Sequence, residues 1–202
     1  MGASAAKLLV YYHPAAATAA RIEQLVHDVA ADCAREDLLL LLEPLVYEPN
    51  PNPNPDPGGG ALAPDARRRA IVEAARRLTG SGVDVLKAEF PAGKDEGEWL
   101  AACEELTAAC PIPWILLSAK VDFETFLRQT EACCRAGASG VAVGRAVWSE
   151  ATRLEGEERT AFLRGPAARR MREATAICAE RGRPWSAVYG APSPDGSWFS
   201  GY

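Results

Sequence analysis

Lys87 stands in a run that otherwise has the composition of a buried strand, VDVLKAEFP at positions 83–91. Burying an ammonium group without a partner is costly, and such groups tend to lose their charge instead. A lysine amine becomes nucleophilic when desolvation or a neighbouring cation lowers its pKa, and it then forms a Schiff base with a carbonyl substrate. The position of Lys87 therefore predicts covalent catalysis through its amine.

Five short apolar runs have the composition of parallel strands covered on both faces. They are KLLVYYH (7–13), LLLLLEPLVY (38–47), VDVLKAEFP (83–91), PWILLSAK (113–120) and SGVAVGRAVW (139–148). Side chains two positions apart share a face of a strand, and ligand sites form at the carboxyl edge of parallel sheets. On this parity each run directs one ionisable or hydroxyl residue to a common face, which predicts a ligand site. These residues are Lys7, Glu43, Lys87, Ser118 and Arg145.

The residues around the predicted nucleophile have complementary chemistry. Glu43, on the run between the first and the third, is placed to move protons as general acid and base. Lys7 and Arg145 are cations that favour a neutral amine nearby. Ser118, Arg145 and the backbone of Gly144 suit an anion such as phosphate, because phosphate sites of α/β barrels recur after the last two strands. Any one of these charged residues, taken alone, is as typical of a buried structural ion pair as of a ligand site.

Segments of helical period separate the five runs. Apolar residues spaced from Ile22 to Cys33 mark one helix, and further helices are predicted over 67–78 and 99–110 and from the N-cap Asp122 to Gly137. The runs begin about 31, 45, 30 and 26 residues apart, the spacing of successive βα units. The predicted fold class is α/β with five such units.

Two stretches interrupt this alternation. EPNPNPNPDPGGG at 48–60 lacks the donors that a helix or ladder needs, so it predicts an irregular loop at the carboxyl edge, either inert or acting as a lid. Residues 157–181 are charged and helical, whereas 183–202 are rich in Pro, Gly and Ser. We therefore expect one domain over 1–182 and an irregular tail over 183–202, either packed on the helices or mobile.

The composition excludes several classes of partner. A chain of 202 residues with 48% hydrophobic content can bury a core, and its net charge of −5 gives no basic surface for nucleic acid or anionic membranes. The sequence shows neither a membrane-spanning run nor a signal peptide, so a cytoplasmic location is expected. His13 and His27 are assigned no catalytic role. The cysteines lack metal-binding spacing and are predicted to be small buried hydrophobic residues, so no metal or other cofactor is expected; they are Cys33, Cys103, Cys110, Cys133, Cys134 and Cys178.

The same runs, extended by a few residues, together resemble a known family. AAKLLVYY, LLLLLEPLVY, SGVDVLKAEFP, PIPWILLSAKVD and AGASGVAVGRAVW are similar, in order and spacing, to the later strands of the bacterial class I aldolases that include tagatose-1,6-bisphosphate aldolase and sulfofructosephosphate aldolase. The likeness extends from about Gly2 to Trp148. It implies part of a (β/α)8 TIM barrel, corresponding to strands four to eight, with the three N-terminal units missing.

The resemblance also implies roles for individual residues. Lys87, in the D-hydrophobic-hydrophobic-K-x-E motif, corresponds to the Schiff-base lysine, and Glu43 of the EP motif corresponds to the proton-transfer residue. Lys7 of the K-L-L motif resembles a substrate-contacting residue. The remaining matches are to positions that hold the phosphate or sulfonate, and they are Ser118, Gly144 and Arg145.

The implied reaction is cleavage of a ketohexose bisphosphate, such as tagatose 1,6-bisphosphate, to dihydroxyacetone phosphate and glyceraldehyde 3-phosphate without a cofactor. Three alternatives stay open: cleavage of sulfofructose phosphate, Schiff-base chemistry on a deoxyribose phosphate, and a truncated, inactive remnant that only binds sugar phosphate. Lys120 stands where the family's S-x-G-V motif has glycine, so either the backbone contact with the anion is altered or the lysine adds a cation to the site. Five strands leave two unpaired edges, which predicts self-association into a homo-oligomer.

Overall fold

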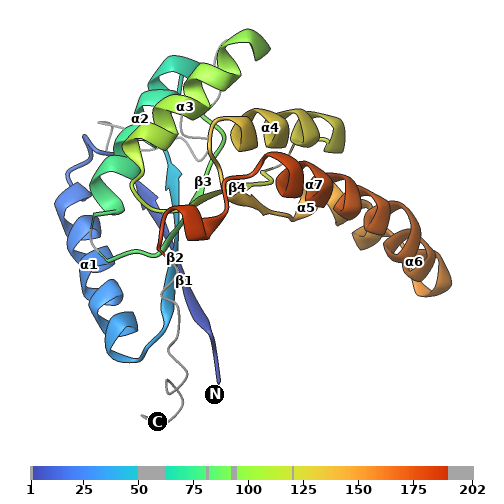
Figure 1. Cartoon of the computed structure of the whole chain (residues 1–202), viewed down its shortest axis with the longest axis horizontal. Coiled ribbons are helices and arrows are strands. Elements are labelled where there is room, and N and C mark those ends of the chain that lie inside the picture. Colours follow the sequence, from blue (N-terminus) through green and yellow to red (C-terminus); the bar gives the residue numbers. More distant parts are fainter. Residues whose placement is uncertain (1, 50–61, 81, 92–94, 120, 191–202) are drawn as a thin grey trace.

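The structure, a computed structural model, describes residues 2–49, 62–80, 82–91, 95–119 and 121–190 of the protein. Within these ranges five strands form one sheet in chain order, and every pair of neighbouring strands is parallel (Figure 1). This confirms the predicted α/β class. The strands are β1 (Ala5–Tyr12), β2 (Leu39–Val46), β3 (Val85–Ala88), β4 (Trp114–Leu117) and β5 (Gly140–Ala142).

A helix follows each of the first four strands, as predicted: α1 (Ala19–Arg35), α2 (Pro64–Leu78), α3 (Trp99–Ala109) and α4 (Phe123–Arg135). Asp122 caps α4 by accepting a hydrogen bond from the Thr125 N–H at 2.9 Å. Residues 157–181 are helical, as predicted, and they include two α-helices, α6 (Gly156–Phe162) and α7 (Ala168–Arg181). A π-helical turn (Leu163–Ala167) separates them, and it contains Pro166, which cannot donate a hydrogen bond.

The prediction of a strand over 139–148 is wrong in its second half. The strand β5 ends at Ala142, and Gly144 precedes the short helix α5 (Arg145–Trp148). Ala146 and Val147 are buried from this helical turn, and the Val147 N–H donates to the Gly144 carbonyl at 2.9 Å. A short apolar run does not distinguish a strand from a buried helical turn, which is why the sequence misled here.

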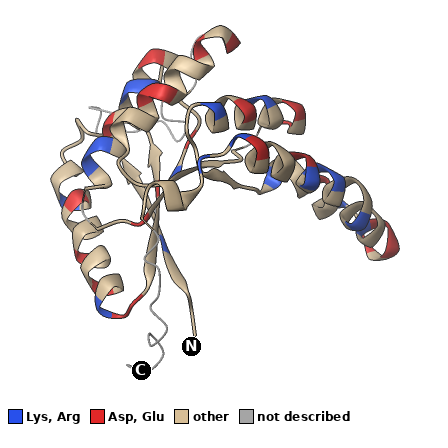
Figure 2. Ribbon diagram, viewed as in Figure 1, with Lys and Arg blue, Asp and Glu red and all other residues tan. Residues whose placement is uncertain are grey.

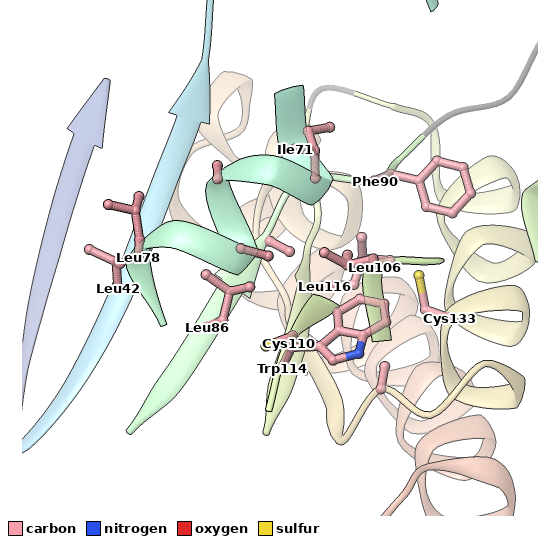
Figure 3. Packing of buried hydrophobic residues seen from close by; sticks show 14 of the residues in the cluster. Leu42, Ile71, Leu78, Leu86, Phe90, Leu106, Cys110, Trp114, Leu116 and Cys133 are labelled. Carbon is pink, nitrogen blue, oxygen red and sulfur yellow. The ribbon is translucent and has the colours of Figure 1, made fainter. Parts of the chain in front are cut away.

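The core lies between the sheet and the helices that cover one of its faces (Figures 1 and 3). Side chains alternate along β1: Val10 and Tyr12 are buried, whereas Leu9 and Tyr11 on the other face are exposed, Tyr11 by 66%. Figure 2 shows charges of both signs interspersed along the helices and few on the strands. Strand residues that pack on the helical side include Leu42, Leu86, Trp114 and Leu116.

Trp114 connects β4 to both α3 and α4 through one hydroxyl group. Its Nε1–H donates to Thr107 Oγ1 at 3.0 Å, and Thr107 Oγ1 donates to the Ala136 carbonyl at 2.7 Å. The end of α4 is a Schellman motif: Gly137 has φ +107°, and the Ala138 N–H bonds the Cys133 carbonyl at 2.9 Å. The predicted end of this helix at Gly137 is thus confirmed.

We expect Thr107→Val to lower the free energy of unfolding by about 1–3 kcal/mol. The substitution keeps the shape of the side chain but leaves the Trp114 indole N–H, on a residue 1% exposed, without its acceptor. Urea denaturation measures the change. Thr160→Val, on exposed α6, is the matched control and is expected to change stability by less than about 0.5 kcal/mol. Equal losses in the two variants contradict the prediction.

The last described residues turn back towards the sheet. A 3₁₀ turn (Trp185–Ala187) follows α7, and the Tyr189 hydroxyl donates to the Asp84 carbonyl at 2.7 Å. Residues 191–202 of the predicted tail, residues 50–60 of the predicted loop and Lys120 lie outside the described residues. Among the residues that are described, no helix has the length and apolar character needed to cross a membrane.

Candidate active site

Two lysines share one carboxylate on the face of the sheet that the helices leave open. Lys7 Nζ and Lys87 Nζ each donate to Glu43 Oε2 at 3.0 Å. Side-chain exposure is 49% for Lys7, 22% for Lys87 and 10% for Glu43. The two amines therefore lie close together over one acceptor, with Lys7 on the side nearer to solvent.

The strand register explains this meeting. In the β1–β2 ladder Lys7 is paired with Leu41, and in the β2–β3 ladder Leu41 is paired with Val85. Paired residues of parallel strands share a face, and residues two further along share it as well. Glu43 and Lys87 each lie two residues after a paired position, so the three ionisable groups point the same way, as the sequence predicted.

The electrostatics of Glu43 favour its ionised form. Burial raises the pKa of this carboxyl, but the hydrogen bonds and positive charges of Lys87 and Lys7 outweigh burial and hold its pKa below the ordinary value. Glu43 is therefore a carboxylate near neutral pH. It is able to accept a proton from an ammonium or a hydroxyl group that lies within hydrogen-bonding distance.

A second carboxylate lies beside this cluster. Glu89 follows β3, accepts a hydrogen bond from the Val46 N–H at 2.8 Å and pairs with Arg67, which lies in the first turn of α2. Burial raises the pKa of Glu89; the Val46 N–H and Arg67 lower it, and the nearby negative charge of Glu43 raises it further. Arg67 thus places an additional cation at the carboxyl edge of the sheet.

Ser118 and Gly144 lie together at the ends of β4 and β5. Ser118 is buried, and a Cβ on Gly144 would lie only 2.9 Å from Ser118 Oγ, so a larger residue at 144 would force a shift. The predicted parity of Ser118 is wrong, however. Leu116 is paired with Ala88, one position after Lys87, so Leu116 shares the helix-covered face, and Ser118 follows the last strand residue.

The predicted placement of Arg145 on a strand is also wrong. Arg145 is exposed and is the first residue of α5. Val141 is paired with Leu116, so the residues of β5 that were expected to share a face with Lys87 share the opposite one. The structure therefore brings Lys7, Glu43 and Lys87 into contact, brings Ser118 to Gly144, and leaves Arg145 facing solvent.

The histidines lie apart from these contacts. His13 follows β1, accepts a hydrogen bond from the Ala15 N–H at 3.2 Å on its Nδ1 and faces the Tyr47 ring edge-on, and burial lowers its pKa. His27 is exposed on α1. Among the described residues, no group of three or more His, Cys, Asp or Glu side chains is arranged to hold a metal ion.

A profile of the family described as DeoC/LacD family aldolase matches residues 1–150 of this chain, which include all of the residues above. The chain belongs to the DeoC/LacD aldolase family. Tagatose 1,6-diphosphate aldolase of Staphylococcus aureus strain JH9 is 32% identical over 172 residues, an alignment that covers 76% of this chain and 52% of that protein. This DeoC/LacD family chain thus spans about half the length of the curated relatives that it matches.

Solved aldolase structures share the fold of this DeoC/LacD family member. A Schiff-base-forming fructose-1,6-bisphosphate aldolase is 23% identical with a TM-score of 0.56, covering 83% of this chain and 58% of that chain. Fructose-bisphosphate aldolase of Plasmodium falciparum is 14% identical with a TM-score of 0.64, covering 90% and 59%. At these identities the likeness shows the fold, and it confirms that the five βα units correspond to part of a barrel-type aldolase chain.

Arg67 is the residue of this DeoC/LacD site that sequence reasoning missed. The helix after a parallel strand begins at the carboxyl edge of the sheet, so a long cationic side chain in its first turn reaches that edge. Arg67 is the fourth residue of α2, three after Pro64. That position was visible in the sequence, but its pairing with Glu89 depends on the packing of α2 and was not.

Glu43 and Glu89 are expected to give opposite pH signatures. A carboxyl whose native pKa is lowered contributes stability above its ordinary pKa of about 4.3, and the contribution is lost as pH falls through the native pKa. The free energy of unfolding of the parent protein minus that of Glu43→Gln should therefore increase between about pH 3 and about pH 5. For Glu89→Gln the difference should decrease as pH rises, because the pKa of Glu89 is raised. Urea unfolding across this range tests both signs; slopes of the same sign contradict the assignment.

Proposed function

We propose that this chain carries the Schiff-base centre of a class I aldolase, with Lys87 as nucleophile and Glu43 as general acid and base. The observation that carries the proposal is the pair of 3.0 Å contacts from Lys87 and Lys7 to one Glu43 oxygen. A nucleophilic amine needs a proton acceptor within hydrogen-bonding reach, and Glu43 supplies it. Lys7 supplies a second cation that keeps the carboxylate in place after Lys87 has reacted.

The reaction follows from these positions. The Lys87 amine attacks the substrate ketone, and loss of water leaves an iminium ion. Glu43 accepts the proton of the C4 hydroxyl, the C3–C4 bond breaks, and its electron pair moves to the iminium nitrogen as an aldehyde departs. The enamine that remains is protonated at C3 by Glu43. Hydrolysis of the resulting iminium ion releases the second product and regenerates the free amine.

The proposed substrate is a ketohexose bisphosphate such as tagatose 1,6-bisphosphate, cleaved to dihydroxyacetone phosphate and glyceraldehyde 3-phosphate. The choice is supported by the Staphylococcus aureus relative, which is named as a tagatose 1,6-diphosphate aldolase. The buried Ser118 hydroxyl beside Gly144 is suited to an oxyanion, and Arg67 and Arg145 are cations in the first turns of the helices that begin at the same edge of the sheet. A phosphate and a sulfonate present the same kind of acceptor oxygens, so sulfofructose phosphate is the competing substrate.

Borohydride trapping is the direct test. Incubation of the folded chain with dihydroxyacetone phosphate and borohydride should add the reduced triose to Lys87, identified by peptide mass spectrometry. A coupled assay should then detect cleavage of tagatose 1,6-bisphosphate, with sulfofructose phosphate assayed in parallel. An adduct on Lys87 without turnover identifies a chain that binds sugar phosphate but does not complete the cycle. No adduct in cooperatively folded protein contradicts the proposed chemistry.

A further inference from the structure

Two thiols face each other where α4 packs against α7. Cys134 Sγ donates a hydrogen bond to Cys178 Sγ at 4.0 Å. One helical turn away, Arg181 Nε forms an ion pair with Glu131 Oε1 at 3.0 Å. Residue numbers rise along α4 as they fall along α7, so these contacts belong to an antiparallel helix pair, which Figure 1 shows side by side. The two sulfur atoms are therefore held together by helix packing rather than by loops.

The two thiols differ in access and in reactivity. Cys178 is half-buried, whereas Cys134 is 2% exposed. The hydrogen bond from Cys134 lowers the pKa of Cys178 although burial opposes it, and the same bond together with burial raises the pKa of Cys134. Because the thiolate is the reactive form of cysteine, Cys178 is the sulfur that reagents from solution reach and react with first.

We propose that Cys178 is a site of oxidation by hydroperoxides and that Cys134 resolves the product to a disulfide between α7 and α4. The Cys178 thiolate attacks the peroxide oxygen, an S–O bond forms, the O–O bond breaks, and the leaving oxygen takes up a proton as water or an alcohol. Cys134 then attacks the sulfenic sulfur. An S–S bond forms, and hydroxide leaves with the Cys134 proton as water, so two thiols are oxidised and one peroxide is reduced.

A second thiol pair provides an internal comparison. Cys103 Sγ and Cys133 Sγ are only 3.6 Å apart, closer than the first pair, but both residues are fully buried. Burial raises the pKa of Cys133 well above the ordinary thiol value. A dissolved peroxide does not reach a pair of fully buried thiols, so the proposal assigns oxidation to the α4–α7 pair in spite of its longer separation.

The disulfide is expected to stabilise the protein. The sulfur atoms must approach from 4.0 Å to about 2.05 Å, a movement that side-chain rotation and a small shift of two packed helices supply. The cross-link joins residues 44 positions apart, and closing a loop of this length restricts the unfolded chain. We expect Tm to rise by roughly 5 °C on oxidation and to return on reduction.

The test is thiol mapping of the folded chain. The protein is treated with hydrogen peroxide, remaining thiols are alkylated, and peptides are analysed without reduction. The expected product is a single cross-link between Cys134 and Cys178. With Cys134→Ser the reaction should stop at a sulfenic acid on Cys178, which dimedone captures, and Cys178→Ser should yield neither product. Cys33→Ser, a buried cysteine on α1, is the matched control and should behave like the parent protein.

Three outcomes overturn the proposal. In the first, peroxide treatment does not change the extent to which Cys134 and Cys178 are alkylated. In the second, the cross-link forms between Cys103 and Cys133 instead. In the third, disulfides form only between separate chains. The mapping on the parent protein needs no substitution, so a variant that fails to fold does not remove the test. Trapping of dihydroxyacetone phosphate at Lys87 is a separate readout and does not depend on the state of these thiols.

Discussion

Lys87→Met is expected to abolish borohydride-dependent labelling by dihydroxyacetone phosphate and to reduce aldol cleavage by about four orders of magnitude or more, the scale seen when a covalent nucleophile is removed. Methionine has nearly the length of lysine and retains its packing on β3, but it has no amine to attack a carbonyl. Mass spectrometry of the trapped protein and the coupled cleavage assay measure the two effects. Both should disappear together, because the iminium ion is required for bond cleavage.

Lys7→Met is the matched control for Lys87→Met. Lys7 contacts the same Glu43 oxygen at 3.0 Å but is about half exposed, so its removal should leave labelling at Lys87 in place. Its expected effect is weaker binding of the anionic substrate, seen as a larger KM, with a smaller effect on kcat. Labelling that survives in Lys87→Met and is lost in Lys7→Met would reverse the roles assigned to the two lysines.

Glu43→Gln is expected to reduce kcat for cleavage by about 10²- to 10⁴-fold, the usual contribution of general acid and base catalysis. Glutamine keeps the shape of the side chain and still accepts a hydrogen bond, but it does not take up the C4 hydroxyl proton. Trapping with dihydroxyacetone phosphate should persist at a reduced rate, because Lys87 remains present. This separation of trapping from cleavage distinguishes a proton-transfer role from a structural one.

The stability of Glu43→Gln needs its own control, because the substitution removes the carboxylate that Lys7 and Lys87 share. Removing the shared carboxylate is expected to lower the free energy of unfolding by about 1 kcal/mol, since Lys7 can turn towards water. The double variant Lys7→Met/Glu43→Gln also removes one of the two amines that shared the carboxylate and should recover part of this loss. A Glu43→Gln protein with unchanged kcat contradicts the assignment of Glu43 as the proton-transfer residue.

Side-chain parity located one half of the candidate site and failed on the other. Lys7, Glu43 and Lys87 were correctly placed on a common face because the register of β1, β2 and β3 keeps the chosen positions in phase. Between β3 and β4 the pairing of Ala88 with Leu116 shifts the phase by one residue. Parity within a strand says which residues share a face, but only the hydrogen-bonded register says which face that is.

The environment of Lys87 also differs from the one that its sequence context indicated. A run of apolar neighbours predicted a dry niche in which the amine loses its charge through desolvation. The structure instead gives Lys87 a carboxylate partner at 3.0 Å and leaves 22% of its side chain exposed. Lys87 and Glu43 are 44 positions apart in the sequence, and their contact depends on the assembled sheet. The local composition around Lys87 therefore did not reveal that its amine lies against a proton acceptor and is not fully buried.

Self-association and the proposed catalysis are expected to use the same uncovered face of the sheet. Leu9, Tyr11 and Leu39 present apolar groups to water on the same side as Lys7 and Lys87. As the protein concentration rises, self-association through this face becomes favourable, and it blocks access of the sugar phosphate to the amines of Lys7 and Lys87. The specific activity per chain is then expected to fall on concentration and to recover on dilution.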